Sequence, residues 1–281
     1  MIKPYCDLHT HSNFSDGTYT PAELIDEAVR LGLSAIALTD HNCISGLAEF
    51  KSAAEGKPIK AVPGVEFSTD YGETELHIVA LFIKEESYEK INALVDDLKK
   101  RKEKCNLELI ERLNAGGYII DLEKLHGESR GQINRAHIAH QLMMAGYVKS
   151  IEEAFDTLLS KNGKFYTQPK RLDVFEVIKF IKSIGAVSVL AHPFLNLSEP
   201  ELREFLPKAK AAGLHAMETL YSKFDDETTA LARKIASEYG IFESGGSDFH
   251  GWRKPGIELG TGRGTLAVPT EFFNALEALK R

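Results

Sequence analysis

Nine side chains that can bind a divalent metal ion are spread along the whole sequence, and nearly all of them follow short apolar runs. They are His9, His11, Asp16, His41, Glu66, His77, His192, Asp248 and His250. Imidazole and carboxylate ligands suit ions such as Zn, Mn and Fe, and the lack of thiolates among them argues against a closed structural zinc site. If these side chains share one site, the fold must bring the ends of most of its strands together.

Two pairs of these residues have the spacing of a chelating pair. His9 and His11 end the apolar run that starts at residue 5, and Asp248 and His250 follow the segment 241–246. Residues two apart on a strand point to the same face, so each pair can bind one ion. A single site would then join both ends of the chain.

A hairpin is predicted around the polar stretch 70–73, which separates Glu66 from His77. If the turn is centred on Tyr71 and Gly72, Glu66 lies directly opposite His77. Directly opposed residues of an antiparallel pair have Cβ atoms roughly 5 Å apart, which is close enough to share one metal ion.

The fold class predicted by the pattern is α/β, because strand-like runs alternate with helical patterns. The first helix has Thr20 as its cap, Pro21 at its first position and Glu23 completing a capping box, and it ends near Gly32. Candidate ligands at the carboxyl ends of strands are typical of (β/α) barrels, and an open doubly wound sheet would gather them less easily. The predicted strands cover 5–9, 35–39, 59–67, 76–83, 187–191, 215–220 and 241–244, which favours a distorted (β/α)7 barrel.

The strand–helix alternation stops between residues 83 and 187, where charged helical segments take over at 87–114, 134–144 and 151–160. We therefore expect a barrel domain formed by 1–86 and 169–281, with an inserted helical cap subdomain at 87–168.

Composition and charge narrow the classes of function. A net charge of −7 disfavours an extended nucleic-acid platform, yet three divalent ions beside three carboxylates would make the site itself positive and suited to a phosphate. Three cysteines without a CxxC motif favour a reducing compartment. Because the sequence shows neither a signal-peptide pattern nor an apolar stretch of the ~20 residues needed to cross a bilayer, we expect a cytoplasmic protein that does not engage membranes.

Six short motifs resemble those of the polymerase and histidinol phosphatase (PHP) family, in the same order and over most of the chain. They are D-L-H-T-H-S-N-F-S-D-G at 7–17, L-T-D-H at 38–41, G-V-E-F at 64–67, E-L-H at 75–77, A-H-P at 191–193 and S-D-F-H at 247–250. The resemblance implies a distorted seven-stranded barrel, two or three divalent ions (Mn, Fe or Zn) at the strand ends, and hydrolysis of phosphoesters. The chain is similar to the small phosphoesterases of this family, including the 3′,5′-nucleotide bisphosphate phosphatases.

The resemblance also implies how the ligands divide among the ions. One ion would be held by His9, His11, Glu66 and Asp248, a second by Glu66, His77 and His192, and a third by Asp16, His41 and His250. Glu66 would bridge the first two. Asp7 and Asp40 adjoin ligands, and either they orient imidazoles or they cap the following turn; we expect the first role.

Cations in the insertion and just after it are candidates for binding the substrate. They are Arg130, Arg135, His137 and Lys170. Arginine suits bidentate phosphate recognition and lysine acts as a point charge, although a solvated helix surface is the alternative for each. The segment N-R-A-H at 134–137 resembles the G-R-P-H segment found in insertions of related phosphoesterases.

The predicted chemistry is phosphoester hydrolysis by a metal-bridging hydroxide, since such a cluster activates water and polarises the phosphoryl group. We expect a small anionic phosphorylated substrate, a nucleotide, and specifically a nucleoside 3′,5′-bisphosphate. The alternatives are a phosphatase for another metabolite such as histidinol phosphate, a 5′-3′ exonuclease on short oligonucleotides, and a metal-dependent binding or regulatory module that has lost catalysis.

Overall fold

The computed structural model describes residues 4–128, 133, 135–160, 163–166 and 171–280. The chain divides into two compact units. One consists of Met1–Ala93 and Leu172–Arg281, here called the barrel unit, and the other of Leu94–Arg171, here called the helical unit.

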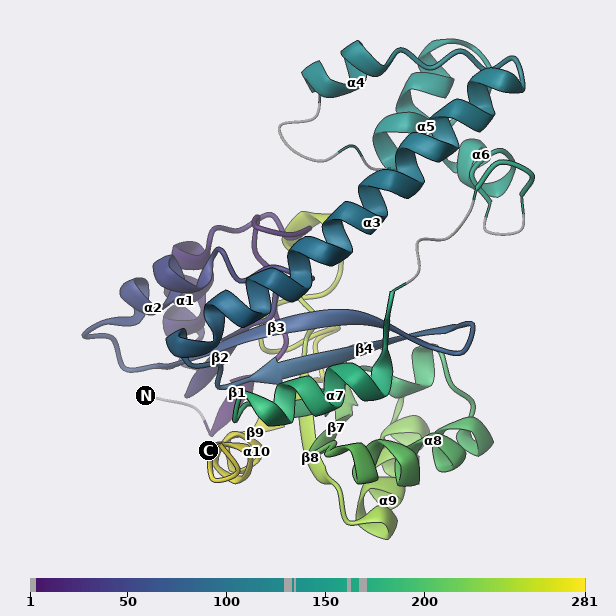
Figure 1. Ribbon diagram of the computed structural model, residues 1–281. Coiled ribbons are helices and arrows are strands. Elements are labelled where there is room, and N and C mark those ends of the chain that lie inside the picture. Colours follow the sequence, from purple (N-terminus) through teal and green to yellow (C-terminus); the bar gives the residue numbers. More distant parts are fainter. Residues whose placement is uncertain (1–3, 129–132, 134, 161–162, 167–170, 281) are drawn as a thin grey trace. The chain divides into compact units, whose positions relative to one another are not determined.

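Seven strands form the wall of the barrel unit, as the sequence predicts (Figure 1). They are β1 (Tyr5–Asp7), β2 (Ala35–Leu38), β3 (Lys60–Tyr71), β4 (Thr74–Leu81), β6 (Val187–Leu190), β7 (Ala216–Tyr221) and β8 (Phe242–Gly246). Their order is β8-β7-β6-β4-β3-β2-β1, and all the neighbours in it are parallel except that β4 runs antiparallel to β3 and β6. Backbone bonds from Leu8 N to Gly245 O (3.2 Å) and from Asp248 N to His9 O (2.9 Å) join the two ends of this order. The predicted distorted barrel is confirmed.

Two further short strands extend the sheet and were not predicted. They are β5 (Leu172–Asp173), which pairs with β3, and β9 (Val268–Pro269), which pairs antiparallel with β1.

The predicted register of the β3–β4 hairpin was wrong by two residues. Glu66 pairs with Val79, and His77 pairs with Ser68. The turn is formed by Gly72 and the residue after it, because a two-residue hairpin turn needs a positive φ that glycine adopts freely, and Gly72 has φ 61°. A shift of two residues keeps every side chain on its face, so Glu66 and His77 are diagonal neighbours on one face.

Helices cover the outside of the barrel unit. The first, α1 (Pro21–Leu31), begins with the predicted capping box of Thr20 and Glu23 and ends at Gly32 in a left-handed conformation. The others are α2 (Leu47–Ala54), α7 (Val174–Ser183), α8 (Glu199–Ala212), α9 (Asp226–Tyr239) and α10 (Thr270–Glu277), with short 3-10 helices at Glu85–Ser87, Pro193–Leu195 and Gly251–Arg253. Figure 1 shows α7 lying along β3 and β4, where its buried face closes one side of the core.

The helical unit has an apolar core of its own. It contains most of α3 (Tyr88–Ala115), then α4 (Leu122–Glu128), α5 (Arg135–Met144) and α6 (Ile151–Asp156). Leu113, Ile138 and Leu142 are buried in this core, and Asn106 of α3 donates a buried hydrogen bond to the carbonyl of Ile133 (2.7 Å). Among the described residues, we find no helix with the length and apolar character required to span a membrane.

Candidate metal centre

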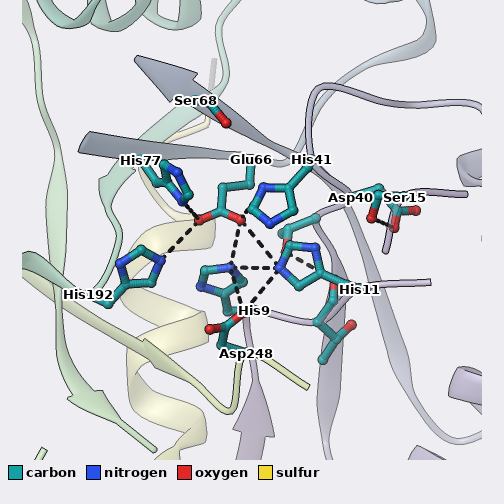
Figure 2. Close-up of polar contacts among 12 residues, drawn as sticks. His9, His11, Ser15, Asp40, His41, Glu66, Ser68, His77, His192 and Asp248 are labelled. Atoms are coloured by element: carbon teal, nitrogen blue, oxygen red, sulfur yellow. Dashed lines mark hydrogen bonds and ion pairs between the residues drawn. The ribbon is translucent and has the colours of Figure 1, made fainter. Parts of the chain in front are cut away.

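All nine predicted ligands of the barrel unit converge on one region. They form four overlapping groups, and within each group the potential ligand atoms lie within 4.8 Å of one another. Figure 2 shows the imidazoles arranged around a single glutamate. The groups are His9–Glu66–His192, His9–His11–Asp248, His41–Glu66–His77 and His11–Asp16–His41–His250.

The topology of the barrel explains this convergence. His9 and His11 follow β1, His41 follows β2, and His192 and Asp248 follow β6 and β8, all at the carboxyl ends of parallel strands. Such ends meet on one face of a barrel. The reversed strand β4 contributes His77 from its first half, and Glu66 lies within the long β3 strand.

Glu66 is fully buried and its two carboxylate oxygens face different imidazoles. Its Oε2 atom lies 3.2 Å from Nε2 of His9 and 3.3 Å from Nε2 of His11. Its Oε1 atom lies 2.9 Å from Nδ1 of His77 and 3.2 Å from Nε2 of His192. A carboxylate that bridges two ions needs this arrangement.

Several buried polar atoms in the cluster are incompletely satisfied by hydrogen bonds, as atoms that bind a metal ion would be. The Nε2 atoms of His9 and His11 face each other at 3.1 Å, although two neutral imidazoles need one donor between them. Nδ1 of His11, Nδ1 of His41, Oε2 of Glu66 and Nε2 of His250 are buried and make no hydrogen bond within the described residues. Buried atoms without partners are rare in proteins, and their convergence fits divalent cations.

A third set of ligands lies around Asp16, whose side chain is 49% exposed. Its Oδ1 atom is 3.1 Å from Nε2 of His250 and 3.8 Å from Nδ1 of His11, and its Oδ2 atom is 3.9 Å from Nε2 of His41. His11 therefore faces this set through Nδ1 and the Glu66 set through Nε2, which the sequence motif did not indicate.

Burial and the carboxylate of Glu66 shift the pKa values of the ligands in different directions. Burial, together with the neighbouring His41, lowers the pKa of His11 to about 3, so its ring stays neutral. Burial also lowers the pKa of His77, but the Glu66 and Glu75 carboxylates more than offset this and raise it to about 10. Burial raises the pKa of Glu66, yet the surrounding imidazoles hold it well below its usual range. Ligand imidazoles must be neutral, so a divalent ion competes with the proton on His77.

Glu218 of β7 supports two ligands and was missed by the sequence reasoning. It is buried, its Oε1 lies 2.8 Å from Nδ1 of His9, and its Oε2 accepts a hydrogen bond from the backbone N–H of His192 (2.6 Å). Since Nε2 of His9 faces the cluster, the proton of that ring belongs on Nδ1, where Glu218 accepts it. The sequence did contain one signal for this role, a carboxylate within the mostly apolar run 216–221.

Asp7 and Asp40 brace the backbone around the site, which corrects the expectation that they orient imidazoles. Asp7 is fully buried and accepts hydrogen bonds from the backbone N–H groups of His9 (3.3 Å), Ser247 (2.9 Å) and Gly260 (2.8 Å). Asp40 accepts from Ser12 N (2.7 Å), Ser12 Oγ (2.6 Å) and Ser15 Oγ (2.6 Å). Figure 2 shows Asp40 beside Ser15, set apart from the imidazoles. Buried backbone N–H and serine O–H groups around the site need acceptors, and the carboxylates of Asp7 and Asp40 provide them.

Asp248 divides its two oxygens between the cluster and its supports. Oδ1 lies 3.3 Å from Nε2 of His11, whereas Oδ2 accepts hydrogen bonds from Tyr221 Oη (2.8 Å) and Lys254 Nζ (2.9 Å). Asp248 has φ 57° and His192 has φ 29°, a region that side chains with a Cβ rarely adopt. Strain of this kind clusters at functional sites, where the surrounding structure maintains it.

The end of β8 approaches β1 closely enough to require glycine. A Cβ atom on Gly246 would lie 2.4 Å from Cβ of His9. This close packing fixes His9, and with it the pair His9 and His11, against β8, the strand that leads to Asp248.

A cavity of about 270 Å³ opens beside the cluster. The ligands His41, His77, His192 and Asp248 line one part of it. The remaining lining residues are Glu75, Leu195, Asn196, Tyr221, Lys223 and Lys254. Two lysines in the loops after β7 and β8 therefore belong to the site, although the sequence reasoning looked for cations only in and just after the insertion.

The two predicted substrate-binding residues that the structure describes, Arg135 and His137, belong to the helical unit. Arg135 begins α5, where its guanidinium lies 4.2 Å from the ring centre of Tyr166 and 5.4 Å from that of Phe155 and donates to Leu159 O (3.5 Å). His137 is half-buried on the same helix. Arg130 and Lys170 lie outside the described residues.

Comparison with known proteins identifies relatives over nearly the whole chain. Residues 7–167 match the PHP domain family. The chain is 33% identical over 265 residues to a 5′-3′ exoribonuclease of Haemophilus influenzae, covering 92% of this chain and 94% of that protein. It is 28% identical over 282 residues to a 3′,5′-nucleoside bisphosphate phosphatase of Chromobacterium violaceum, covering 97% and 96%.

A solved structure agrees with this relationship. A Bifidobacterium adolescentis protein assigned as a metal-dependent phosphoesterase superposes with a TM-score of 0.77 at 26% identity, covering 98% of this chain and 96% of the other. The barrel, its ligand cluster and these relatives define a metal-dependent phosphoesterase, a hydrolase of phosphoric esters. The chain belongs to the PHP domain family.

Proposed function

We propose that the protein is a phosphatase that hydrolyses a phosphomonoester of a nucleotide, with a nucleoside 3′,5′-bisphosphate as its substrate. The Chromobacterium violaceum phosphatase supports this proposal, because it aligns over nearly the full length of both chains. The cavity beside the cluster supports it further, since metal ligands and lysines line it together and a doubly phosphorylated molecule carries two anionic groups.

The chain's own residues would divide the work as follows. In the division that the resemblance implies, His9, His11, Glu66 and Asp248 would hold one divalent ion, Glu66, His77 and His192 a second, and Asp16, His41 and His250 a third, with Mn, Fe or Zn as the candidates. All nine residues belong to the overlapping ligand groups of the structure. Bound ions would supply Lewis acidity and an activated water for attack on phosphorus.

Groups around the ligands set their orientation and surroundings. Glu218 fixes the tautomer of His9, and Tyr221 and Lys254 hold the outer oxygen of Asp248. Lys254 also lines the cavity, where its positive charge would stabilise a phosphoryl group. We further propose a cytoplasmic location, which the three free cysteines support.

A second candidate is a 5′-3′ exonuclease that acts on short oligoribonucleotides. The Haemophilus influenzae exoribonuclease favours it, being 33% identical over 92% of this chain. An exonuclease would hydrolyse the first phosphodiester bond of the strand, and this too requires attack of an activated water on phosphorus. A net charge of −7 speaks against an extended binding track for the rest of the strand.

Kinetics on matched substrates test the proposal. The purified enzyme with added Mn²⁺ would be assayed with adenosine 3′,5′-bisphosphate, adenosine 3′- and 5′-monophosphates, an aryl phosphate and a 5′-phosphorylated short oligoribonucleotide. We expect the highest kcat/KM for the bisphosphate, with release of one phosphate. A higher kcat/KM for the oligonucleotide would favour the exonuclease instead, and a His192→Asn variant prepared in parallel would report any contaminating phosphatase.

A further inference from the structure

One cation in the cavity has no neutralising partner among the described residues. The carboxylates and ammonium groups of the lining are those of Glu75, Asp248, Lys223 and Lys254. Glu75 Oε1 lies 3.3 Å from Nε2 of His77, and Asp248 Oδ2 accepts from Lys254 Nζ at 2.9 Å. Both carboxylates therefore face a group that can carry positive charge.

Lys223 differs from Lys254 in this respect. Its side chain is exposed, and within the described part of the chain its ammonium makes no hydrogen bond or ion pair. It lies two residues past Tyr221, in the turn closed by the bond from Phe224 N to Tyr221 O (3.0 Å). A hydrogen-bonded turn thus places the ammonium group of Lys223 in the lining of a cavity that metal ligands also line.

An apolar contact surface lies in the same cavity. Leu195 is 43% exposed, and it follows the ligand His192 by three residues in a short 3-10 helix. Asn196 fixes this segment, because its side-chain amide donates to Glu75 O (2.7 Å). The lining therefore combines a metal cluster, an exposed leucine and an uncommitted ammonium group.

We propose that Lys223 binds the second, non-reacting phosphate of the substrate and so sets the preference for a doubly phosphorylated nucleotide. This inference rests on the proposed function. An ammonium group binds phosphate as a point charge, and since Lys223 has no partner among the described residues, no ion pair with them must be broken first. The specificity determinant then lies in the barrel unit, whereas Arg135 of the helical unit is already bound to its own aromatic neighbours.

Steady-state kinetics of Lys223→Met test the assignment. The variant keeps most of the length of the unbranched side chain and removes the ammonium group, with its charge and its N–H donors. We expect the ratio of kcat/KM for adenosine 3′,5′-bisphosphate to that for an aryl phosphate to fall roughly tenfold to hundredfold, mostly through KM. Lys223→Arg should retain most of the ratio. Lys234→Met is the matched control, because Lys234 is an exposed lysine of α9 paired only loosely with Glu238 (3.9 Å) and should keep the wild-type ratio.

The outcomes separate this inference from the proposed function. A bisphosphate preference that survives in Lys223→Met, or losses of equal size on both substrates, would overturn the role of Lys223 and leave the proposed function standing. A wild-type enzyme that does not prefer the bisphosphate to the monophosphates would overturn both. Thermal denaturation of each variant shows that the fold is intact, which the exposure of Lys223 leads us to expect.

Discussion

Replacing Glu218 with glutamine tests how strongly the metal centre depends on groups behind its ligands. In the protein, Oε1 accepts from Nδ1 of His9 and Oε2 accepts from the backbone N–H of His192. Glutamine has the same shape but only one acceptor atom. Whichever way its amide turns, one buried N–H then faces another donor.

The size of the effect follows from this mismatch. A buried donor left without an acceptor costs about 1–3 kcal/mol, and loss of a group that orients a metal ligand typically costs roughly tenfold to hundredfold in metal affinity or activity. We therefore expect Glu218→Gln to lower both metal affinity and kcat/KM roughly tenfold to hundredfold, while circular dichroism reports an unchanged fold.

The assay combines metal titration with turnover of an aryl phosphate. Glu243→Gln is the control, because Glu243 lies on the neighbouring strand β8 and bonds to Thr219 (2.7 Å) and Arg233 (2.8 Å), outside the ligand groups. Wild-type metal affinity and activity in Glu218→Gln would refute the reasoning, and so would equal losses in the two variants.

Three further substitutions probe other parts of the account. Asp248→Asn removes a ligand charge and should lower kcat by orders of magnitude with little change in the unfolding temperature; activity near wild type would show that Asp248 is not a ligand. Gly246→Ala places a Cβ 2.4 Å from that of His9 and should lower the yield of folded, metal-loaded protein, whereas normal metal content would contradict the close packing. Arg135→Ala removes a cation–π contact with Tyr166 and should lower the local stability of the helical unit by about 0.5–2 kcal/mol, which faster amide exchange there would report. Unchanged exchange with a raised KM for the bisphosphate would instead favour the sequence-based role of Arg135 in substrate binding.

The ligand cluster was predictable because its residues share a simple geometric rule. Candidate ligands follow separate strand-like runs, and parallel strands of a barrel end on one face. His9, His41, His192 and Asp248 were found in this way, and the structure brings them together. The capping box of the first helix was equally local, since its bonds connect residues only three apart.

Features that depend on a tertiary partner were harder to predict. The hairpin register was wrong because both possible turns keep the same side chains on the same face, and they differ in whether Gly72 takes the first or the second turn position. Glu218 lies in a strand whose neighbours are apolar, and nothing local marks which imidazole it contacts. Lys223 was missed because an exposed lysine after a strand resembles any surface lysine until the cavity is known.

Metal stoichiometry tests the central claim, that the nine ligands form one centre for divalent ions. Elemental analysis of protein expressed and purified with excess Mn²⁺ should approach three ions per chain, because the nine converging ligands include the three sets that the family resemblance implies. Removal by a chelator should abolish phosphoester hydrolysis, and added Mn²⁺ should restore it. Full activity with one ion per chain under saturating metal would contradict the three-ion arrangement, and activity that survives complete chelation would contradict the metal centre itself.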